Sequence, residues 1–432
     1  MKSTLTLALL PLLLAPLVHA QPQAEVKNVI YMVGDGMGPA YLTAYRYYLA
    51  GAPGSKVTPT VFDQLLVGSA STYPDDDTWV TDSAAAATAL AAGVKSFNGA
   101  IGVDADKKSL PSLLVAAKQA GKTTGVVSTS QINHATPASF VAHHESRRAY
   151  QPIAEQMGSA LKAKEIDLMF GGGQSFFDAA AIDALSDSGA SIATDWQQLG
   201  QLQQLPAVAL LADVALPFAI DAKRNDRLAL MTTKALALAE QDRDGFSVLI
   251  EGSLIDWCGH SNDIACAMAE MDDFANAITV AKEYVDQHPN TLLVVTADHS
   301  TGGLTLGAAG EYQWLPMEIR KVHASADVIA KAFVAAKRNQ ETYQQVWRSM
   351  VDFDLTEQQL HALLAFADDA HWPRVSYIGN IVATRSYTGW TTGGHTAVDV
   401  PVMAYGAGAE QFIGMQDNTD LPKKIMQLLQ ID

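Results

Sequence analysis

The chain is 432 residues long, with 48% hydrophobic and 17% charged residues, and its formal net charge is −17. This length allows two or three domains, or one large α/β core with insertions. The acidic balance argues against a general nucleic-acid partner or an anionic membrane surface, so a site for an anionic substrate would need its own positive charge from metal ions and arginine.

The first 20 residues have the pattern of a secretory signal peptide. Lys2 supplies a positive start, residues 7–17 are apolar, and Val18 and Ala20 place small residues before a cleavage point. The apolar run is about 11 residues long, which is short for a membrane span of roughly 20. An uncleaved anchor is the alternative. We predict a mature protein of residues 21–432 that is periplasmic or secreted and has no membrane partner.

Strand-like apolar runs alternate with helical stretches along most of the chain. The predicted strands cover residues 28–33, 124–128, 167–170, 246–251, 292–297 and 402–405, and the predicted helices include 82–92, 109–120, 222–241 and 268–287. This alternation predicts an α/β fold: a mainly parallel central sheet with helices on both faces, forming a three-layer sandwich. In such a sheet the carboxyl ends of the strands share one edge, where ligands distant in sequence converge.

The first strand ends in a glycine-rich segment, Gly34-Asp35-Gly36-Met37-Gly38. The spacing differs from the GxGxxG fingerprint of dinucleotide-binding loops, and no partner acid follows at the expected distance. Asp35 as a metal ligand explains the segment better than a nucleotide loop does.

A serine opens the alanine-rich helix that follows Thr81 and Asp82. One interpretation makes Thr81, Asp82 or Ser83 a plain N-cap. The other makes Ser83 a nucleophile whose hydroxyl is activated by zinc. The start of a helix also favours an incoming anion.

Two further segments carry polar groups of interest. His134 and Thr136 lie in the segment HATPA, and Arg147 and Arg148 lie in the segment SRR. Adjacent arginines are usually solvated surface charge. Beside a metal cluster in an acidic protein, one of them would bind a phosphate through two parallel hydrogen bonds.

The strand at 246–251 ends on Glu251 and leads to Asp256 and His260. On a helix, residues four apart share one face, which suits two ligands of one metal; a surface ion pair is the alternative. Cys258 and Cys266 are the two cysteines of the chain. On one continuous helix they would lie roughly 12 Å apart, too far for a disulfide, so we expect free thiols unless the helix breaks between them.

The strand at 292–297 runs into Asp298 and His299, and a last histidine, His395, follows Gly393-Gly394. An Asp-His pair in a loop is common in proteins, but its place after a buried strand favours metal ligation. Residues 307–382 are helix-rich and carry several aromatic side chains. We interpret this stretch as an inserted cap or crown above the sheet edge, with an ordinary continuation of the fold as the alternative.

Taken in order, these segments resemble the alkaline phosphatase family over nearly the whole mature chain. The motifs are VGDGMG at 33–38, TDSAAAATAL at 81–90, HATPA at 134–138, SRR at 146–148, EGSLIDWCGH at 251–260, TADHSTGG at 296–303 and TTGGHT at 391–396. The resemblance implies a catalytic domain of residues 21–432 that hydrolyses small-molecule phosphate monoesters through a phosphoserine. A homodimer is compatible with it.

The resemblance also implies two zinc ions and one magnesium ion. The implied ligands are Asp256, His260 and His395 for the first zinc, Asp35, Asp298 and His299 for the second, and Asp35, Thr136 and Glu251 for magnesium. Ser83 would be the nucleophile, and Arg147 would hold the non-bridging phosphate oxygens.

The chain departs from the enterobacterial form of the family at two positions near the magnesium site. His134 and Trp257 stand where that form has Asp and Lys, as in marine bacterial members. The three-metal core is retained, whereas phosphate affinity and the metal preference of the third site are open. A phosphodiesterase or sulfatase of the same superfamily, or a non-catalytic metal- or phosphate-binding protein, is the alternative. The segment TDSAA lacks the C/S-x-P-x-R context of a sulfatase.

Overall fold

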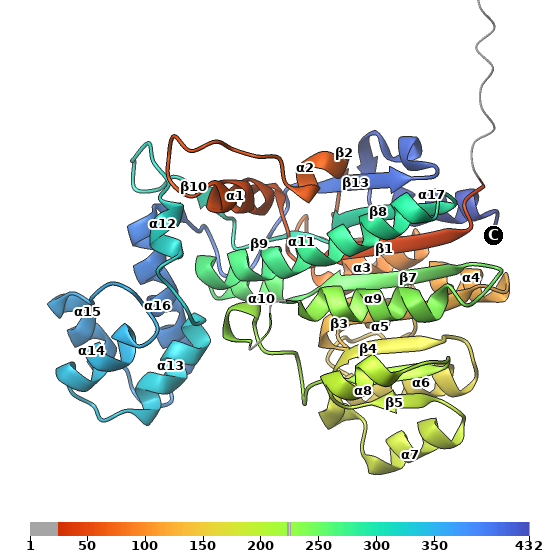
Figure 1. Ribbon diagram of the computed structural model, residues 1–432, viewed down its shortest axis with the longest axis horizontal. Coiled ribbons are helices and arrows are strands. Elements are labelled where there is room, and N and C mark those ends of the chain that lie inside the picture. The colour runs from red at the N-terminus through yellow and green to blue at the C-terminus, as the bar shows by residue number, and fades with distance from the viewer. Residues whose placement is uncertain (1–24, 223, 225, 432) are drawn as a thin grey trace, which may run out of the picture.

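The computed structural model describes residues 25–431 except 223 and 225, so the predicted signal peptide lies outside the described residues. The centre of the molecule is a ten-stranded sheet (Figure 1). From one edge to the other its strands are β14 (Gly414–Asp417), β2 (Leu66–Ser71), β13 (Val400–Gly406), β8 (Thr291–Ala297), β1 (Asn28–Gly34), β7 (Phe246–Gly252), β3 (Thr123–Gln131), β4 (Leu168–Gly172), β6 (Ala207–Leu210) and β5 (Ser191–Ala193).

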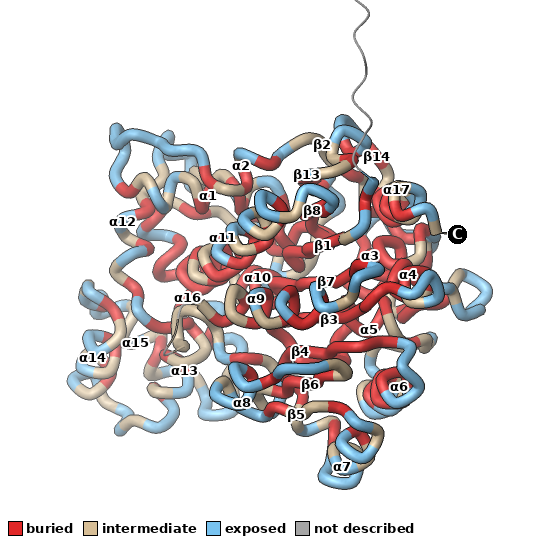
Figure 2. The backbone as a smooth tube through the Cα atoms, turned by 45° about the vertical axis from the view of Figure 1, so that its right-hand side comes forward, coloured by how far each residue is buried: buried red, intermediate tan, exposed pale blue. Residues whose placement is uncertain are grey.

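The sheet is mainly parallel, as the sequence predicts. Among the described strands of this sheet, only β13 runs antiparallel to its neighbours, β2 and β8. The central strands β3, β7 and β8 are buried along their whole length. Figure 2 shows this buried layer between partly exposed helices. Strands covered on both faces have no solvent-exposed face, so polar residues do not alternate with apolar ones and the apolar runs are continuous.

Helices cover both faces of the sheet. Helices α9 (Arg227–Ala239) and α11 (Ile264–Gln287) pack on one face, and α4 (Leu113–Gln119) and α5 (Ala135–Ser139) pack on the other (Figure 1). The other helices of this part are α1 (Pro39–Ala50), α2 (Val61–Leu65), α3 (Ser83–Ala92), α6 (Tyr150–Lys162), α7 (Ala179–Asp187), α8 (Trp196–Gln201), α10 (Leu254–His260) and α17 (Asp420–Leu429). None of the helices within the described residues has the length and hydrophobicity needed to cross a bilayer.

A second group of helices lies beside one end of the sheet (Figure 1). Its members are α12 (Pro316–Ile319), α13 (Ala326–Ala335), α14 (Gln340–Arg348), α15 (Glu357–Ala365) and α16 (His371–Ser386). These helices have apolar contacts of their own: Phe333 stacks on Tyr343, and Trp347 is fully buried. The short ribbon of β10 (Thr305–Leu306) and β11 (Thr388–Gly389) joins the chain where it enters and leaves the group.

The prediction of free cysteines is wrong. Cys258 and Cys266 form a disulfide with a Cα–Cα distance of 5.5 Å. The prediction assumed one continuous helix, but α10 ends at His260 and α11 begins at Ile264. The chain turns between them through Asn262, whose φ is 51°, and Asp263 then caps α11 by accepting bonds from the amides of Ala265 and Cys266. This turn brings the two sulfurs together.

Candidate active site

Three acidic residues meet at the carboxyl edge of the sheet because their strands are in register. Gly34 of β1 pairs with Gly252 of β7 on one side and with Ala297 of β8 on the other. Asp35 and Asp298 therefore lie at the same level of neighbouring strands, and Glu251, which pairs with Val33, lies two residues earlier on the third strand. All three side chains are fully buried. Burial raises the pKa of Asp35 well above its ordinary value, and the nearby carboxylates Asp298, Asp256 and Glu251 raise it further. Such a cluster needs a cation.

Gly36 lets the backbone pass closely between these acids. Its φ is 72°, and an added Cβ would lie 2.6 Å from Thr301 Oγ1 and 2.9 Å from the backbone of Asp256. Its amide donates a hydrogen bond of 3.0 Å to Asp298 Oδ1. The glycine-rich segment therefore serves the acid cluster through close backbone approach.

Helix α10 and a short ribbon bring three more side chains to the same edge. His395 lies on β12 (His395–Thr396), which pairs with β9 (Ser300–Thr301) directly after Asp298 and His299. Asp256 and His260 lie one turn apart on α10, with 3.2 Å between Asp256 Oδ2 and His260 Nε2. The Nε2 atoms of His260 and His395 are also 3.2 Å apart.

The two histidines are oriented as metal ligands usually are. His260 Nδ1 is 2.6 Å from the carbonyl of Gly393, and His395 Nδ1 is 2.8 Å from the carbonyl of Thr81. A ring N–H donated to a carbonyl leaves Nε2 as the ligating atom, and both Nε2 atoms face Asp256. Burial lowers the pKa of His395 to about 4, which keeps its imidazole neutral.

A second group consists of Asp35, Asp298 and His299, whose ligand atoms lie within 4.8 Å of one another. Asp298 Oδ2 and both carboxylate oxygens of Asp35 are buried without a hydrogen-bond partner among the described residues. Buried carboxylate oxygens with no partner are rare, because each loses its hydration without compensation. A divalent cation supplies what these oxygens lack, so the residues fit a metal.

The third group brings Asp35 and Glu251 together with His134, again within 4.8 Å. Thr136 Oγ1, Glu251 Oε1 and His134 Nδ1 are buried and have no hydrogen-bond partner in the part of the chain that the structure describes. The other oxygen of Glu251 accepts a 2.6 Å bond from Ser128. Burial raises the pKa of Glu251 to about 7 and lowers that of His134 to about 3, so the imidazole is neutral. The geometry thus adds an imidazole to a site expected to offer oxygen alone.

Ser83 is the first residue of α3, and the N-cap of that helix is Asp82, which accepts a 2.9 Å bond from the amide of Ala85. Ser83 is therefore not needed as the cap. Its Oγ lies 3.2 Å from His299 Nε2, at the edge of the second group, and the residue is 1% exposed. A hydroxyl in this position can attack an electrophile held at the metal cluster.

Arg147 supplies a fixed positive charge beside Ser83. Its Nη1 donates a 3.0 Å bond to Asp82 Oδ2, and its Nη2 lies 3.4 Å from His134 Nε2. Burial lowers the pKa of Arg147, but the Asp82 carboxylate and other nearby carboxylates together raise it by more, so the guanidinium stays charged. The neighbouring Arg148 is exposed. Trp257 packs edge-on against His134, with 5.8 Å between the ring centroids.

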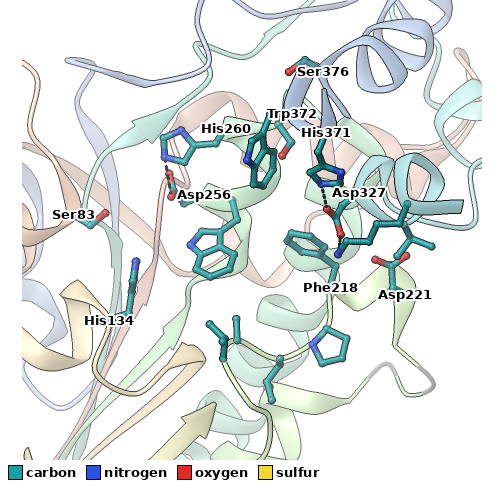
Figure 3. A pocket seen from close by; sticks show the side chains of 18 of the residues that line it. Ser83, His134, Phe218, Asp221, Asp256, His260, Asp327, His371, Trp372 and Ser376 are labelled. Atoms are coloured by element: carbon teal, nitrogen blue, oxygen red, sulfur yellow. Dashed lines mark hydrogen bonds and ion pairs between the residues drawn. The ribbon is translucent and has the colours of Figure 1, made fainter. Parts of the chain in front are cut away.

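A cavity of about 980 Å³ lies beside these groups and is lined by Ser83, His134, Arg147, Asp256, His260 and His395 among others. Figure 3 shows Ser83, His134, Asp256 and His260 on one side of it, and Phe218, Asp327, His371 and Trp372 on the other. The first side holds residues that the sequence singles out. The second side comes from the loop after β6 and from α13 and α16, and no sequence motif pointed to it.

All twelve residues singled out from the sequence lie in or beside this cluster. Three supporting groups were missed: Thr301, which donates to Asp256, and Ser128 and Ser253, whose hydroxyls are 2.7 Å apart beside Glu251. A hydroxyl that orients a carboxylate leaves no spacing signal in the sequence. Asp82 was considered as a helix cap, but its bond to Arg147 depends on tertiary structure.

The parallel sheet and its acid–imidazole groups define a metallohydrolase. The family model for alkaline phosphatase matches residues 26–431, and the chain belongs to that family, as the sequence motifs predicted. It is thus a phosphoric monoester hydrolase that binds divalent metal ions and acts on small-molecule phosphate monoesters.

Similar proteins cover almost the whole chain. Alkaline phosphatase 3 of Bacillus subtilis (strain 168) is 42% identical over 416 residues, which are 94% of this chain and 90% of that protein. The cold-active alkaline phosphatase of the psychrophile Shewanella sp. is 47% identical, with a TM-score of 0.87 over 93% of this chain and 99% of that one. A variant of the alkaline phosphatase from the Antarctic bacterium TAB5, described with Mg bound in its M3 site, is 28% identical, with a TM-score of 0.70 over 95% and 99% of the two chains.

Proposed function

We propose that the protein is an exported alkaline phosphatase that works through a phosphoserine on Ser83. The position of Ser83 carries this proposal: its Oγ lies 3.2 Å from His299 Nε2, at the start of a helix and beside the charged Arg147. The predicted signal peptide supports a periplasmic or secreted location. The family supports phosphate monoesters as substrates.

The proposed metal content is two zinc ions and one magnesium ion. The residues that would hold them are Asp256, His260 and His395 for the first zinc, Asp35, Asp298 and His299 for the second, and Asp35, Thr136 and Glu251 for magnesium, with His134 beside the last group. When bound, these ions supply Lewis-acid charge for a phosphoryl group and lower the pKa of hydroxyl and water oxygens.

The side chains of the chain itself perform the following steps. Arg147, held by Asp82, presents its remaining N–H groups to two non-bridging oxygens of the phosphate. Ser83 Oγ forms a new bond to phosphorus while the bond to the ester oxygen breaks, and the alcohol leaves. Water then attacks the phosphoserine and releases inorganic phosphate, which regenerates Ser83. The start of α3 favours the anion throughout.

We further propose that residues 21–432 form one catalytic domain and that 307–382 is an insertion flanking the site. The β10–β11 ribbon at the two ends of this stretch supports the insertion. Asp327, Lys331, His371 and Trp372 line the same cavity as Ser83, which supports the flanking position.

Turnover of three esters tests the proposed reaction. We expect hydrolysis of p-nitrophenyl phosphate to exceed that of bis-p-nitrophenyl phosphate and of p-nitrophenyl sulfate. Elemental analysis should find two zinc and one magnesium per chain, chelation should abolish turnover, and zinc with magnesium should restore it. Preferred turnover of the diester or the sulfate would replace the proposal with a phosphodiesterase or a sulfatase. Undiminished turnover by metal-free protein would refute the metal assignment.

A further inference from the structure

The cavity is larger than the reacting group requires. Its volume of about 980 Å³ lies at the upper end of the range that encloses a drug-sized molecule. One part only is lined by Ser83, Arg147, His134, Asp256, His260 and His395. The remaining space must be filled by the alcohol part of a substrate or by water.

The far part of the cavity has an apolar and aromatic wall. The loop between β6 and α9 contributes Val214, Leu216, Pro217 and Phe218, and α16 contributes Trp372. Trp372 is 67% exposed, which is unusual for so large an apolar side chain. In Figure 3, Phe218 and Trp372 lie across the cavity from Ser83 and His134. A ring bound against them would need a spacer between itself and the phosphate.

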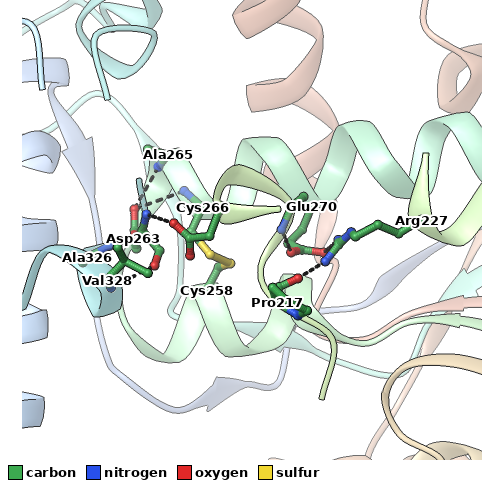
Figure 4. The surroundings of a disulfide bond; sticks show 12 residues. Pro217, Arg227, Cys258, Asp263, Ala265, Cys266, Glu270, Ala326 and Val328 are labelled. Carbon is green, nitrogen blue, oxygen red and sulfur yellow. Dashed lines mark hydrogen bonds and ion pairs between the residues drawn. A yellow bond between two sulfur atoms is a disulfide. The ribbon is translucent and has the colours of Figure 1, made fainter. Parts of the chain in front are cut away.

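A buried ion cluster holds the loop of this wall in place. Arg227 donates to the carbonyl of Pro217 (Figure 4), and Glu270 Oε1 accepts a 2.6 Å bond from the amide of Ala219. Arg227 also binds Glu270 at 2.8 Å and Asp273 at 3.0 Å, and the three side chains are at most 3% exposed. Phe218 thus lies between two anchored residues, so the backbone that carries its ring is held before a ligand arrives.

The charged groups at this end are mostly paired. Asp327 binds His371 at 2.8 Å and Lys331 at 2.6 Å. Asp221 is the other carboxylate that lines this end, and its Oδ1 accepts a 2.8 Å bond from the amide of Ser325. Because two carboxylates face one lysine and one histidine, this end does not attract a second phosphate. It suits an uncharged group.

We propose that Phe218 and Trp372 bind the alcohol part of the substrate and favour phosphate monoesters in which a spacer links the phosphate to a flat aromatic ring. A nucleoside monophosphate has this form. The inference rests on the proposed function, since it names the substrate class of the same site. The alcohol departs when the phosphoserine forms, so its contacts with the wall act on kcat/KM. Hydrolysis of the phosphoserine is common to all substrates.

Adenosine 5′-monophosphate and ribose 5-phosphate form a matched pair for the test, because in both the leaving oxygen is the primary 5-oxygen of a ribose and only the first carries a base. We expect wild-type kcat/KM to be several-fold higher for the nucleotide. Trp372→Ala should lower the value for the nucleotide about three- to tenfold, the range that one aromatic contact provides. The value for ribose 5-phosphate should fall much less. Trp372→Phe should keep most of the preference, and Phe218→Ala should lose it as Trp372→Ala does.

Tyr312→Ala is the matched control, because Tyr312 is a fully exposed aromatic residue outside this cavity. This substitution should leave kcat/KM unchanged for both substrates. Equal turnover of the two substrates by wild type, or an equal effect of Trp372→Ala on both, would overturn the inference. If p-nitrophenyl phosphate is hydrolysed in that experiment, the proposed function survives. If no ester is hydrolysed by metal-loaded protein, the proposed function fails with it.

Discussion

The two sides of the cavity are built in different ways. On the side of Ser83, the acids lie at the ends of neighbouring parallel strands, and strand register brings Asp35 level with Asp298 and within two residues of Glu251. On the opposite side, Phe218 lies in a loop held by buried ion pairs, and Trp372 lies on an exposed helix turn. The difference separates two tasks. The sheet edge fixes the reacting groups, whereas the loop after β6 and helix α16 set which alcohol is accepted. Substitutions on one side can therefore leave the other side unchanged.

The nucleophile gives the largest expected effect on the sheet-edge side. Ser83→Ala should lower turnover of p-nitrophenyl phosphate by about 10³-fold or more, because the variant lacks the hydroxyl that forms the proposed covalent intermediate. Metal content should stay the same. Labelled phosphate should be trapped on wild type and not on the variant.

Ser112→Ala is a matched control for that substitution. Ser112 is equally buried and caps α4 by accepting a 3.2 Å bond from the amide of Val115. Its loss should lower stability by about 1 kcal/mol and leave turnover intact. Near-normal activity of Ser83→Ala, or label on another residue, would refute the assignment of the nucleophile.

The buried ion cluster should give the largest effect on the opposite side. Arg227→Met leaves Glu270 and Asp273 buried without their cation, which should lower the free energy of unfolding by roughly 3–5 kcal/mol. Urea denaturation measures this change. Replacing all three charged side chains by Met, Gln and Asn should recover part of the loss. A single variant as stable as wild type would show that the cluster does not hold the loop.

The sequence predicted the sheet-edge side far better than the opposite side. Asp35, Glu251 and Asp298 could be predicted as site residues because each follows a continuous apolar run, and parallel strands end at a common edge. Phe218 and Trp372 could not be predicted, since neither belongs to a periodic pattern and their meeting depends on how two segments pack on the core. The ribbon that brings His395 to His299 likewise appears only in three dimensions.

The disulfide shows where a local rule failed. Helical spacing placed Cys258 and Cys266 far apart, but a residue with positive φ at Asn262 ended the helix between them. Asn adopts this conformation more readily than most residues, which was the available signal. On a continuous helix without this turn, Cys258 and Cys266 would be too far apart to form a disulfide.

Removing the disulfide should have a smaller effect than breaking the ion cluster. The closed loop is short, so Cys258→Ser with Cys266→Ser should lower the free energy of unfolding by roughly 2–3 kcal/mol. Cys258 lies between Asp256 and His260 on α10, so the variant should also release metal faster during dialysis against a chelator. Reducing agent should destabilise wild type and leave the double variant unaffected. Equal stability with and without the cysteines would contradict a stapling role.

The smallest expected effect concerns two residues on the Ser83 side of the cavity, His134 and Trp257. Trp257 packs on His134, and both line the cavity beside Arg147. In His134→Asp with Trp257→Lys, an ammonium replaces an indole near the phosphate, and at an effective dielectric of about 20 a charge roughly 10 Å away adds about 1–2 kcal/mol of attraction. The inhibition constant of inorganic phosphate should therefore fall about tenfold. The aspartate replaces an imidazole with a harder oxygen ligand, so activation by magnesium should also shift to lower concentration.

Trp257→Met is the control for lost packing without added charge, and it should leave phosphate inhibition within twofold of wild type. If the double variant carries its metals and neither constant moves, Trp257 and His134 serve packing alone, and the phosphate is held entirely by the residues of the sheet edge, α3 and Arg147.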